Sequence, residues 1–132
     1  MQKSRIAVLA AALAAPAYAE TVDLACDNEQ RGSLELRVDY DRKTVEVTPG
    51  RSCTWTIDGR KIVVPNCAPP APAQISDSSI SWSGTEKIVN AAGGVGEREI
   101  SGTVNRLTGH VWVRAGGFDA FRGTCRRAER KF

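Results

Sequence analysis

The chain of 132 residues has one histidine, one methionine and few aromatic residues, which make up 6% of its composition. One histidine, and four cysteines without a Cys-x-x-Cys pair, do not match the usual zinc-ligand spacings. After residue 20, no apolar run approaches the roughly 20 residues of a membrane-spanning helix. No segment of ten or more residues there repeats its apolar residues at the helical period. We therefore expect no metal or cofactor, no membrane span and little helix.

Neither sign of charge dominates the composition. The sequence holds 18 Lys and Arg against 15 Asp and Glu, a formal net charge of +3. Lys3 and Arg5 contribute to that excess from the N-terminal leader, so the remainder is close to neutral and unlike a cationic nucleic-acid binder. The most one-sided stretch runs from Arg122 to Phe132, which fits a solubilising tail or contact with an envelope polyanion or acidic partner.

The N-terminus has the pattern of a secretory signal peptide. Basic residues precede an apolar run from Ile6 to Ala15, and Ala17-Tyr18-Ala19 forms a small-x-small cleavage site. We predict cleavage after Ala19, which leaves residues 20–132 as a single domain in the periplasm or secreted from the cell.

The remaining chain contains four cysteines, Cys26, Cys53, Cys67 and Cys125. An even number in a small exported domain predicts two disulfides, for which three connectivities exist. We favour Cys53–Cys67, which closes a short loop around a predicted hairpin, and Cys26–Cys125, which ties the first strand to the last.

Apolar and polar residues alternate through most of the chain. Leu34, Leu36 and Val38 alternate with charged residues, as in a strand with one wet face. Asp58-Gly59, between two β-rich runs, is typical of a type I′ hairpin turn. The same alternation recurs as far as Arg126. We predict an all-β fold, a small antiparallel barrel or sandwich of about eight to ten short strands.

Three segments are expected to interrupt these strands. The proline-rich segment 65–74 is predicted to be an extended connection, neither helix nor central strand. Ser83-Gly84-Thr85-Glu86 is predicted to be a turn. Gly93–Gly96 is predicted to be a hairpin loop rather than a phosphate-binding loop, because Glu97 follows it and no helix is predicted.

Few side chains are candidates for catalysis. His110 is the only histidine, and no serine lies in a Gly-x-Ser-x-Gly elbow, so a hydrolase that uses His110 stays an alternative. Five glutamates fall at expected outward or loop positions and are predicted to form a solvated face rather than a glycosidase pair. They are Glu35, Glu46, Glu86, Glu97 and Glu99.

The three tryptophans separate into two kinds. Trp55 and Trp82 share strand faces with isoleucines, which predicts that they lie in the core. Trp112 shares its face with His110 and Arg114, opposite two valines. If the valines point inward, this face is an exposed Trp–Arg surface of the kind enriched at binding hot spots. If the strand is inverted, Trp112 lies in the core, and alternation alone does not choose between the two.

The C-terminal third resembles a group of small exported bacterial proteins without an assigned activity. The matching residues are Val104-Asn105-Arg106-Leu107-Thr108-Gly109, Gly123-Thr124-Cys125 and the ending Lys131-Phe132. The resemblance implies a Gram-negative periplasmic protein and no particular mechanism.

A weaker similarity is to the periplasmic C-type lysozyme inhibitors, which are exported all-β domains of this size with a disulfide. That family inserts a loop with a Ser-Gly-x-x-Tyr motif into the lysozyme cleft. Here Ser83 and Gly84 match its Ser-Gly, whereas Lys87 replaces the tyrosine. The similarity implies that Ser83 and Gly84 lie on a binding loop.

These observations favour a non-catalytic binding module that acts on an envelope or secreted protein. Binding is expected through a loop or through the face that carries His110, Trp112 and Arg114. The alternatives are an inhibitor of a lysozyme-like hydrolase, a small hydrolase that uses His110, and a structural envelope protein. The sequence leaves the partner and the oligomeric state open.

Overall fold

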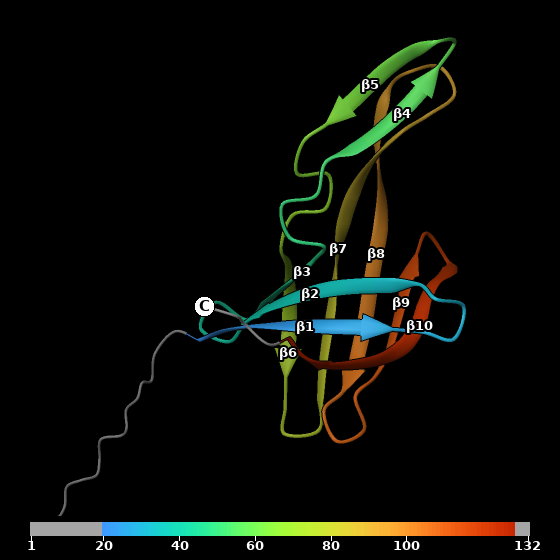
Figure 1. Ribbon diagram of the computed structural model, residues 1–132. Helices are drawn as coiled ribbons and strands as arrows, with labels where there is room; N and C mark the ends of the chain where they lie inside the picture. The colour runs from blue at the N-terminus through green and yellow to red at the C-terminus, as the bar shows by residue number, and fades with distance from the viewer. Residues whose placement is uncertain (1–19, 129–132) are drawn as a thin grey trace, which may run out of the picture.

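The structure, a computed structural model, describes residues 20–128. This range contains ten strands and no helix. Eight strands form a closed antiparallel barrel in the order β1-β10-β9-β8-β7-β6-β3-β2, and β4 and β5 form a separate hairpin (Figure 1). The strands are β1 Thr21–Asp27, β2 Ser33–Asp39, β3 Thr44–Val47, β4 Cys53–Ile57, β5 Arg60–Val64, β6 Ala71–Ile75, β7 Ser79–Val89, β8 Val95–Asn105, β9 His110–Ala115 and β10 Phe118–Arg127. The predicted all-β fold is confirmed, and the barrel is the correct one of the two architectures.

The predicted signal peptide, residues 1–19, lies outside the described residues, as does the end of the basic segment, residues 129–132. No helix in the described part of the chain is long and apolar enough to cross a membrane.

The barrel is filled by the inward rows of the alternating strands. Leu36 and Val38 of β2 are almost fully buried, as expected from their alternation with charged residues. Trp82 of β7 packs among them and lies directly opposite Gly102 of β8. A Cβ atom on Gly102 would lie 2.3 Å from Cζ2 of Trp82, so the absence of a side chain there makes room for the indole ring.

Both predicted disulfides are present. Cys26 and Cys125 are directly paired across β1 and β10, so their bond fastens the seam where the first strand meets the last. Cys53 and Cys67 join the start of β4 to the segment before β6. Disulfides persist in oxidising surroundings, and two of them fit a protein that works outside the cytosol.

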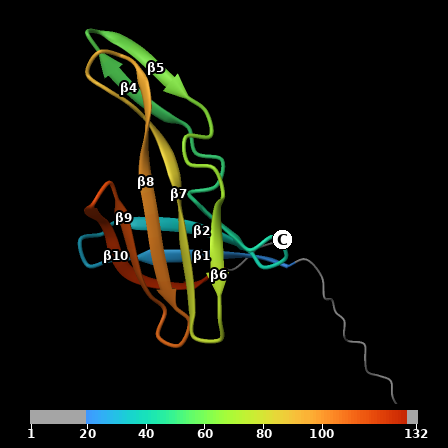
Figure 2. The same ribbon diagram turned by 180° about the vertical axis from the view of Figure 1, so that it is seen from behind.

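The β7–β8 hairpin is longer than the barrel. Its pairing runs without a break from Ser79 and Asn105 to Val89 and Val95. Its far end projects from the barrel, with the β4–β5 hairpin beside it in both views (Figures 1 and 2). A second, smaller apolar cluster holds the two hairpins together; it consists of Val64, Cys67 and Val89, with Cys53, Trp55, Ile57 and Ile62 packed against it.

Trp82 lies in the barrel core, as predicted. Trp55, also predicted to lie in the core, is only half-buried and packs against the second cluster, outside the barrel. Asp58 and Gly59, at the turn between β4 and β5, both have positive φ, 51° and 77°. This is what the predicted type I′ turn requires.

The predicted turn at 83–86 is wrong. This segment lies in the middle of β7, where Ser83 pairs with Ser101 and Gly84 with Ile100. A Cβ atom on Gly84 would lie 2.7 Å from Cβ of Ala71 on the neighbouring strand. Glycine is therefore needed at this position for the close approach of β6, and not for a change of chain direction.

The prediction that segment 65–74 contains no central strand is also wrong, because β6 is a strand of the closed barrel and includes Pro72. Ala73 donates its N–H to the carbonyl of Lys43 on the β3 side, so the nitrogen of Pro72 faces the other side. Pairing with β7 on that side begins only at Ala73. Pro72 therefore lies where the ladder does not need its missing N–H.

Candidate functional site

Strand β9 presents Trp112 to the outside of the barrel. Val111 and Val113 are buried in the core, whereas Trp112 is 37% exposed, and His110 and Arg114 beside it are also exposed. Of the two orientations that the sequence allows, the one with an exposed tryptophan is therefore correct. The predicted residues His110, Trp112 and Arg114 share one outer face.

The Trp112 side chain is held by neighbours from β10. Its Nε1–H donates a hydrogen bond of 2.9 Å to Oδ1 of Asp119. The guanidinium of Arg122, which pairs with Trp112 across the strands, lies 4.5 Å from a ring centroid of the indole, and that of Arg114 lies 5.4 Å from it. Both distances are within the range of cation–π attraction. We call Trp112, Arg114, Asp119 and Arg122 the Trp112 cluster.

Asp119 also binds the two arginines of the cluster. Its carboxylate lies 3.7 Å from Nε of Arg114 and 3.6 Å from Nε of Arg122. Arg114 further donates to the carbonyl of Gly117 in the β9–β10 turn, over 2.9 Å. The cluster thus has its orientation set before any partner arrives, although each ion pair is exposed and contributes little to stability.

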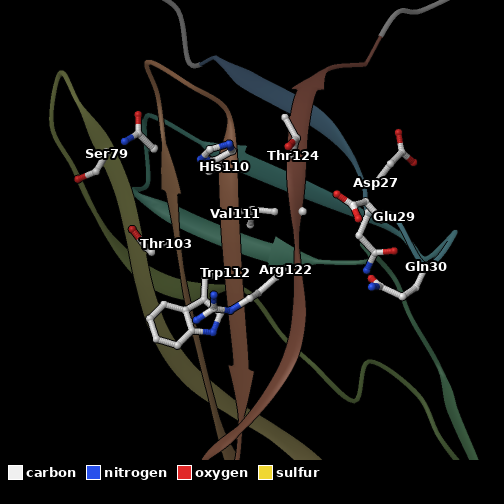
Figure 3. A pocket seen from close by; sticks show the side chains of 13 residues that line it. Asp27, Glu29, Gln30, Ser79, Thr103, His110, Val111, Trp112, Arg122 and Thr124 are labelled. Atoms are coloured by element: carbon white, nitrogen blue, oxygen red, sulfur yellow. The ribbon is translucent and has the colours of Figure 1, made fainter.

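An open groove of about 800 Å³ begins at this cluster. One side is formed by Thr103, Trp112 and Thr124 on adjacent strands, and the other by the end of β1 and the turn that follows it, with Asp27 and Glu29 (Figure 3). An aromatic face, hydroxyl groups and carboxylates at separate places are typical of a recognition site.

The turn that forms the far side of the groove is itself well supported. The side-chain Oδ1 of Asn28 accepts a hydrogen bond of 2.7 Å from the N–H of Gly32, and its carbonyl accepts one of 3.1 Å from Arg31. Asp27, at the end of β1, pairs with Thr124 of β10. The two sides of the groove are therefore held at a defined separation by the barrel.

His110 lies in the same groove, farther along β9 (Figure 3). Its backbone N–H donates to Oγ1 of Thr108, but within residues 20–128 its imidazole has no hydrogen bond or ion pair. A histidine that acts as a base needs a second group to orient it. Nor do the described residues include a group of three or more His, Cys, Asp or Glu side chains placed to hold a metal ion.

Ser83 and Gly84 are separate from this groove. Ser83 points outward from the middle of β7, where its hydroxyl donates to the carboxylate of Glu99 over 3.4 Å. Gly84 packs against Ala71. The resemblance to lysozyme inhibitors implies a loop at these two residues, and the structure has a barrel strand there instead.

A second polar cluster lies at one end of the barrel, where Glu86 is only 6% exposed. Oε1 of Glu86 accepts a hydrogen bond of 2.8 Å from Nη2 of Arg51, and its Oε2 accepts one of 2.9 Å from Nε of Arg98. The prediction that Glu86 belongs to a solvated face is therefore wrong. In a continuous strand Glu86 shares the inward face of Trp82, because side chains alternate between the two faces. The predicted turn at 83–86 interrupts that strand and so gives no reason to place Glu86 inside.

Comparison of the chain with protein-family models, with curated proteins and with solved structures finds no match.

Proposed function

We propose that the protein is an exported, non-catalytic binding module that holds an envelope or secreted protein against the Trp112 cluster. The observation that carries the proposal is the exposed Trp112, fixed by Asp119 and two arginines at the edge of an open groove. Tryptophan and arginine are the residue types most enriched at binding hot spots. A side chain that is already oriented loses less conformational freedom when it binds.

Two features of the chain support export. The N-terminal leader has the charge, apolar run and small-x-small site of a signal peptide. All four cysteines are paired in disulfides, which is typical of proteins outside the cytosol.

Export predicts a specific mature N-terminus. Expressed at its natural length in a Gram-negative cell, the protein should be recovered from the periplasm or the medium with Glu20 as its first residue. Intact-mass and N-terminal peptide measurements would show this together with two disulfides. Recovery of the uncleaved chain from the cytoplasm, with free thiols, would contradict export. The protein would then not meet the envelope or secreted partner that the proposal requires.

Replacement of Trp112 by alanine should weaken binding. Hot-spot tryptophans contribute about 2 kcal/mol or more, so we expect affinity for a captured partner to fall by roughly thirtyfold. The oxidised domain would be used as bait in periplasmic and secreted extracts, and the enriched protein would then be purified and titrated. Arg122→Ala should also weaken binding, because Arg122 lies against the same ring.

Val63→Ala is the matched control. Val63 is 54% exposed on β5, in the hairpin that is separate from the barrel. The substitution therefore removes exposed apolar surface outside the groove. Its affinity should equal that of the unmodified protein. A folded Trp112→Ala variant that binds as tightly as the control would overturn the proposed site.

A lysozyme-like hydrolase is one partner that this experiment would detect. If such an enzyme is captured, inhibition should depend on Trp112 and be unaffected by Ser83→Ala, because Ser83 lies within β7 and away from the groove. The opposite dependence would move the site to the face of β7.

A further inference from the structure

A second cavity, of about 520 Å³, lies at the end of the barrel from which the long β7–β8 hairpin projects. We call it the mouth cavity. Apolar side chains from five barrel strands line it: Leu34, Val47, Ile100, Val113, Ala115 and Phe121. Trp55 of the β4–β5 hairpin lines it from outside the barrel. Its volume is within the range of about 300–1,000 Å³ that is usual for small-molecule sites.

The charged cluster around Glu86 lies in the wall of the same cavity. Two guanidinium groups, of Arg51 and Arg98, face one carboxylate there. No other acidic residue lines the mouth cavity within the described part of the chain. The polar wall therefore carries an excess of positive charge beside the apolar side chains of the lining.

Glu86 uses only part of the donor capacity of the two arginines. A guanidinium has five N–H donors, and one N–H from Arg51 and two from Arg98 are given to Glu86. The Nε of Arg51 is buried and has no hydrogen-bond partner among residues 20–128. Since that nitrogen is closed to solvent, a head group in the cavity would accept from the donors that remain on the partly exposed ends of the two guanidinium groups.

We propose that the mouth cavity binds a small amphipathic anion, namely an alkyl chain with one carboxylate or phosphate head group. The chain occupies the apolar space between β3, β8 and β9, and the head group accepts hydrogen bonds from Arg51 and Arg98 beside Glu86. Arginine is well suited to this role because its fork of donors matches carboxylate and phosphate oxygens. This site is separate from the Trp112 groove, which lies on the outer surface of the barrel.

The test compares three ligands with the same ten-carbon chain: decanoate, decanol and decyltrimethylammonium. Each would be titrated below its micelle concentration into the oxidised protein and followed by amide chemical shifts. Decanoate should bind saturably, and about tenfold or more tightly than decanol, because only decanoate pairs with the arginines. The cation should bind weakest. Decyl phosphate, in a further titration, shows whether the carboxylate or the phosphate is the better head group.

The shifted amides should gather at Val47, Ile100 and Val113, and the indole N–H of Trp112 should not move. This mapping needs no variant. Absence of saturable decanoate binding, equal affinity for decanol, or shifts centred on Trp112 would each overturn the proposal.

Arg51→Gln tests the charge directly. It should weaken decanoate binding about tenfold and leave decanol binding unchanged, since the apolar lining is intact. Trp112→Ala is the control and should bind decanoate like the unmodified protein. Loss of decanoate binding in the control, or its persistence in a folded Arg51→Gln variant, would contradict the assignment. Because the two sites use different residues, failure here leaves the proposed function of the Trp112 groove untouched.

Discussion

Replacement of both Cys26 and Cys125 by serine is expected to lower the free energy of unfolding by about 2–5 kcal/mol. The two cysteines are 99 residues apart in the sequence, and their bond fastens the seam between β1 and β10. The bond thereby restricts nearly the whole unfolded chain, and the chain-entropy model assigns about 4.7 kcal/mol to a loop of about 100 residues. Equilibrium unfolding in urea, measured by circular dichroism, would give the difference.

The double serine variant of Cys53 and Cys67 is the matched control. These cysteines are 14 residues apart, and the same model assigns about 3 kcal/mol to a loop of that size. Their bond holds the β4–β5 hairpin rather than a strand pair of the barrel. A greater loss of stability in this control than in the seam variant would show that the hairpin, and not the seam, governs unfolding.

Trp82→Ala is expected to cost about 3–5 kcal/mol, the range for a buried aromatic residue cut back to alanine. Trp82 is 4% exposed and contributes its ring to the centre of the barrel core. The strands around it are joined in a closed ring, so they have little freedom to collapse into the vacated space. Urea unfolding of the oxidised variant would measure the loss.

Gly102→Ala provides a second measurement of the same contact. The added methyl would lie 2.3 Å from the indole and should cost about 1–3 kcal/mol as overpacking. In the Trp82→Ala background the ring is gone, so the same substitution should cost much less. Additive costs in the double variant would mean that the ring and the glycine are not coupled as the structure indicates.

The strands and disulfides could be predicted from the sequence because their signals are local. The alternation at Leu34–Val38 defines a strand and its buried face without knowledge of any partner strand. The Asp58-Gly59 turn is encoded by two residues that tolerate positive φ. Closure into a barrel is different, because it depends on the pairing of β1 with β10 and of β3 with β6, which are distant in the sequence.

The candidate sites could be predicted only in part for the same reason. Alternation places His110, Trp112 and Arg114 on one face, but the far side of the groove that His110 and Trp112 line comes from the end of β1 and the β1–β2 turn, far earlier in the sequence. The mouth cavity was missed because Arg51 and Glu86 belong to separate segments that meet only in the fold. Gly84 favours a turn in the sequence alone, because a glycine that makes room for Ala71 on a neighbouring strand cannot be distinguished there from a glycine in a turn.

The position of the seam also sets an order of events during oxidative folding. Cys26 and Cys125 are 99 residues apart and meet only when the first strand pairs with the last, whereas Cys53 and Cys67 are 14 residues apart. A short loop closes more readily than a long one, so the bond between Cys53 and Cys67 is expected to form early. Each of these two cysteines is then unavailable as a wrong partner for Cys26. Once the disulfide of the hairpin has formed, Cys125 is the one cysteine left to pair with Cys26, so the disulfide of the barrel forms with the correct partner.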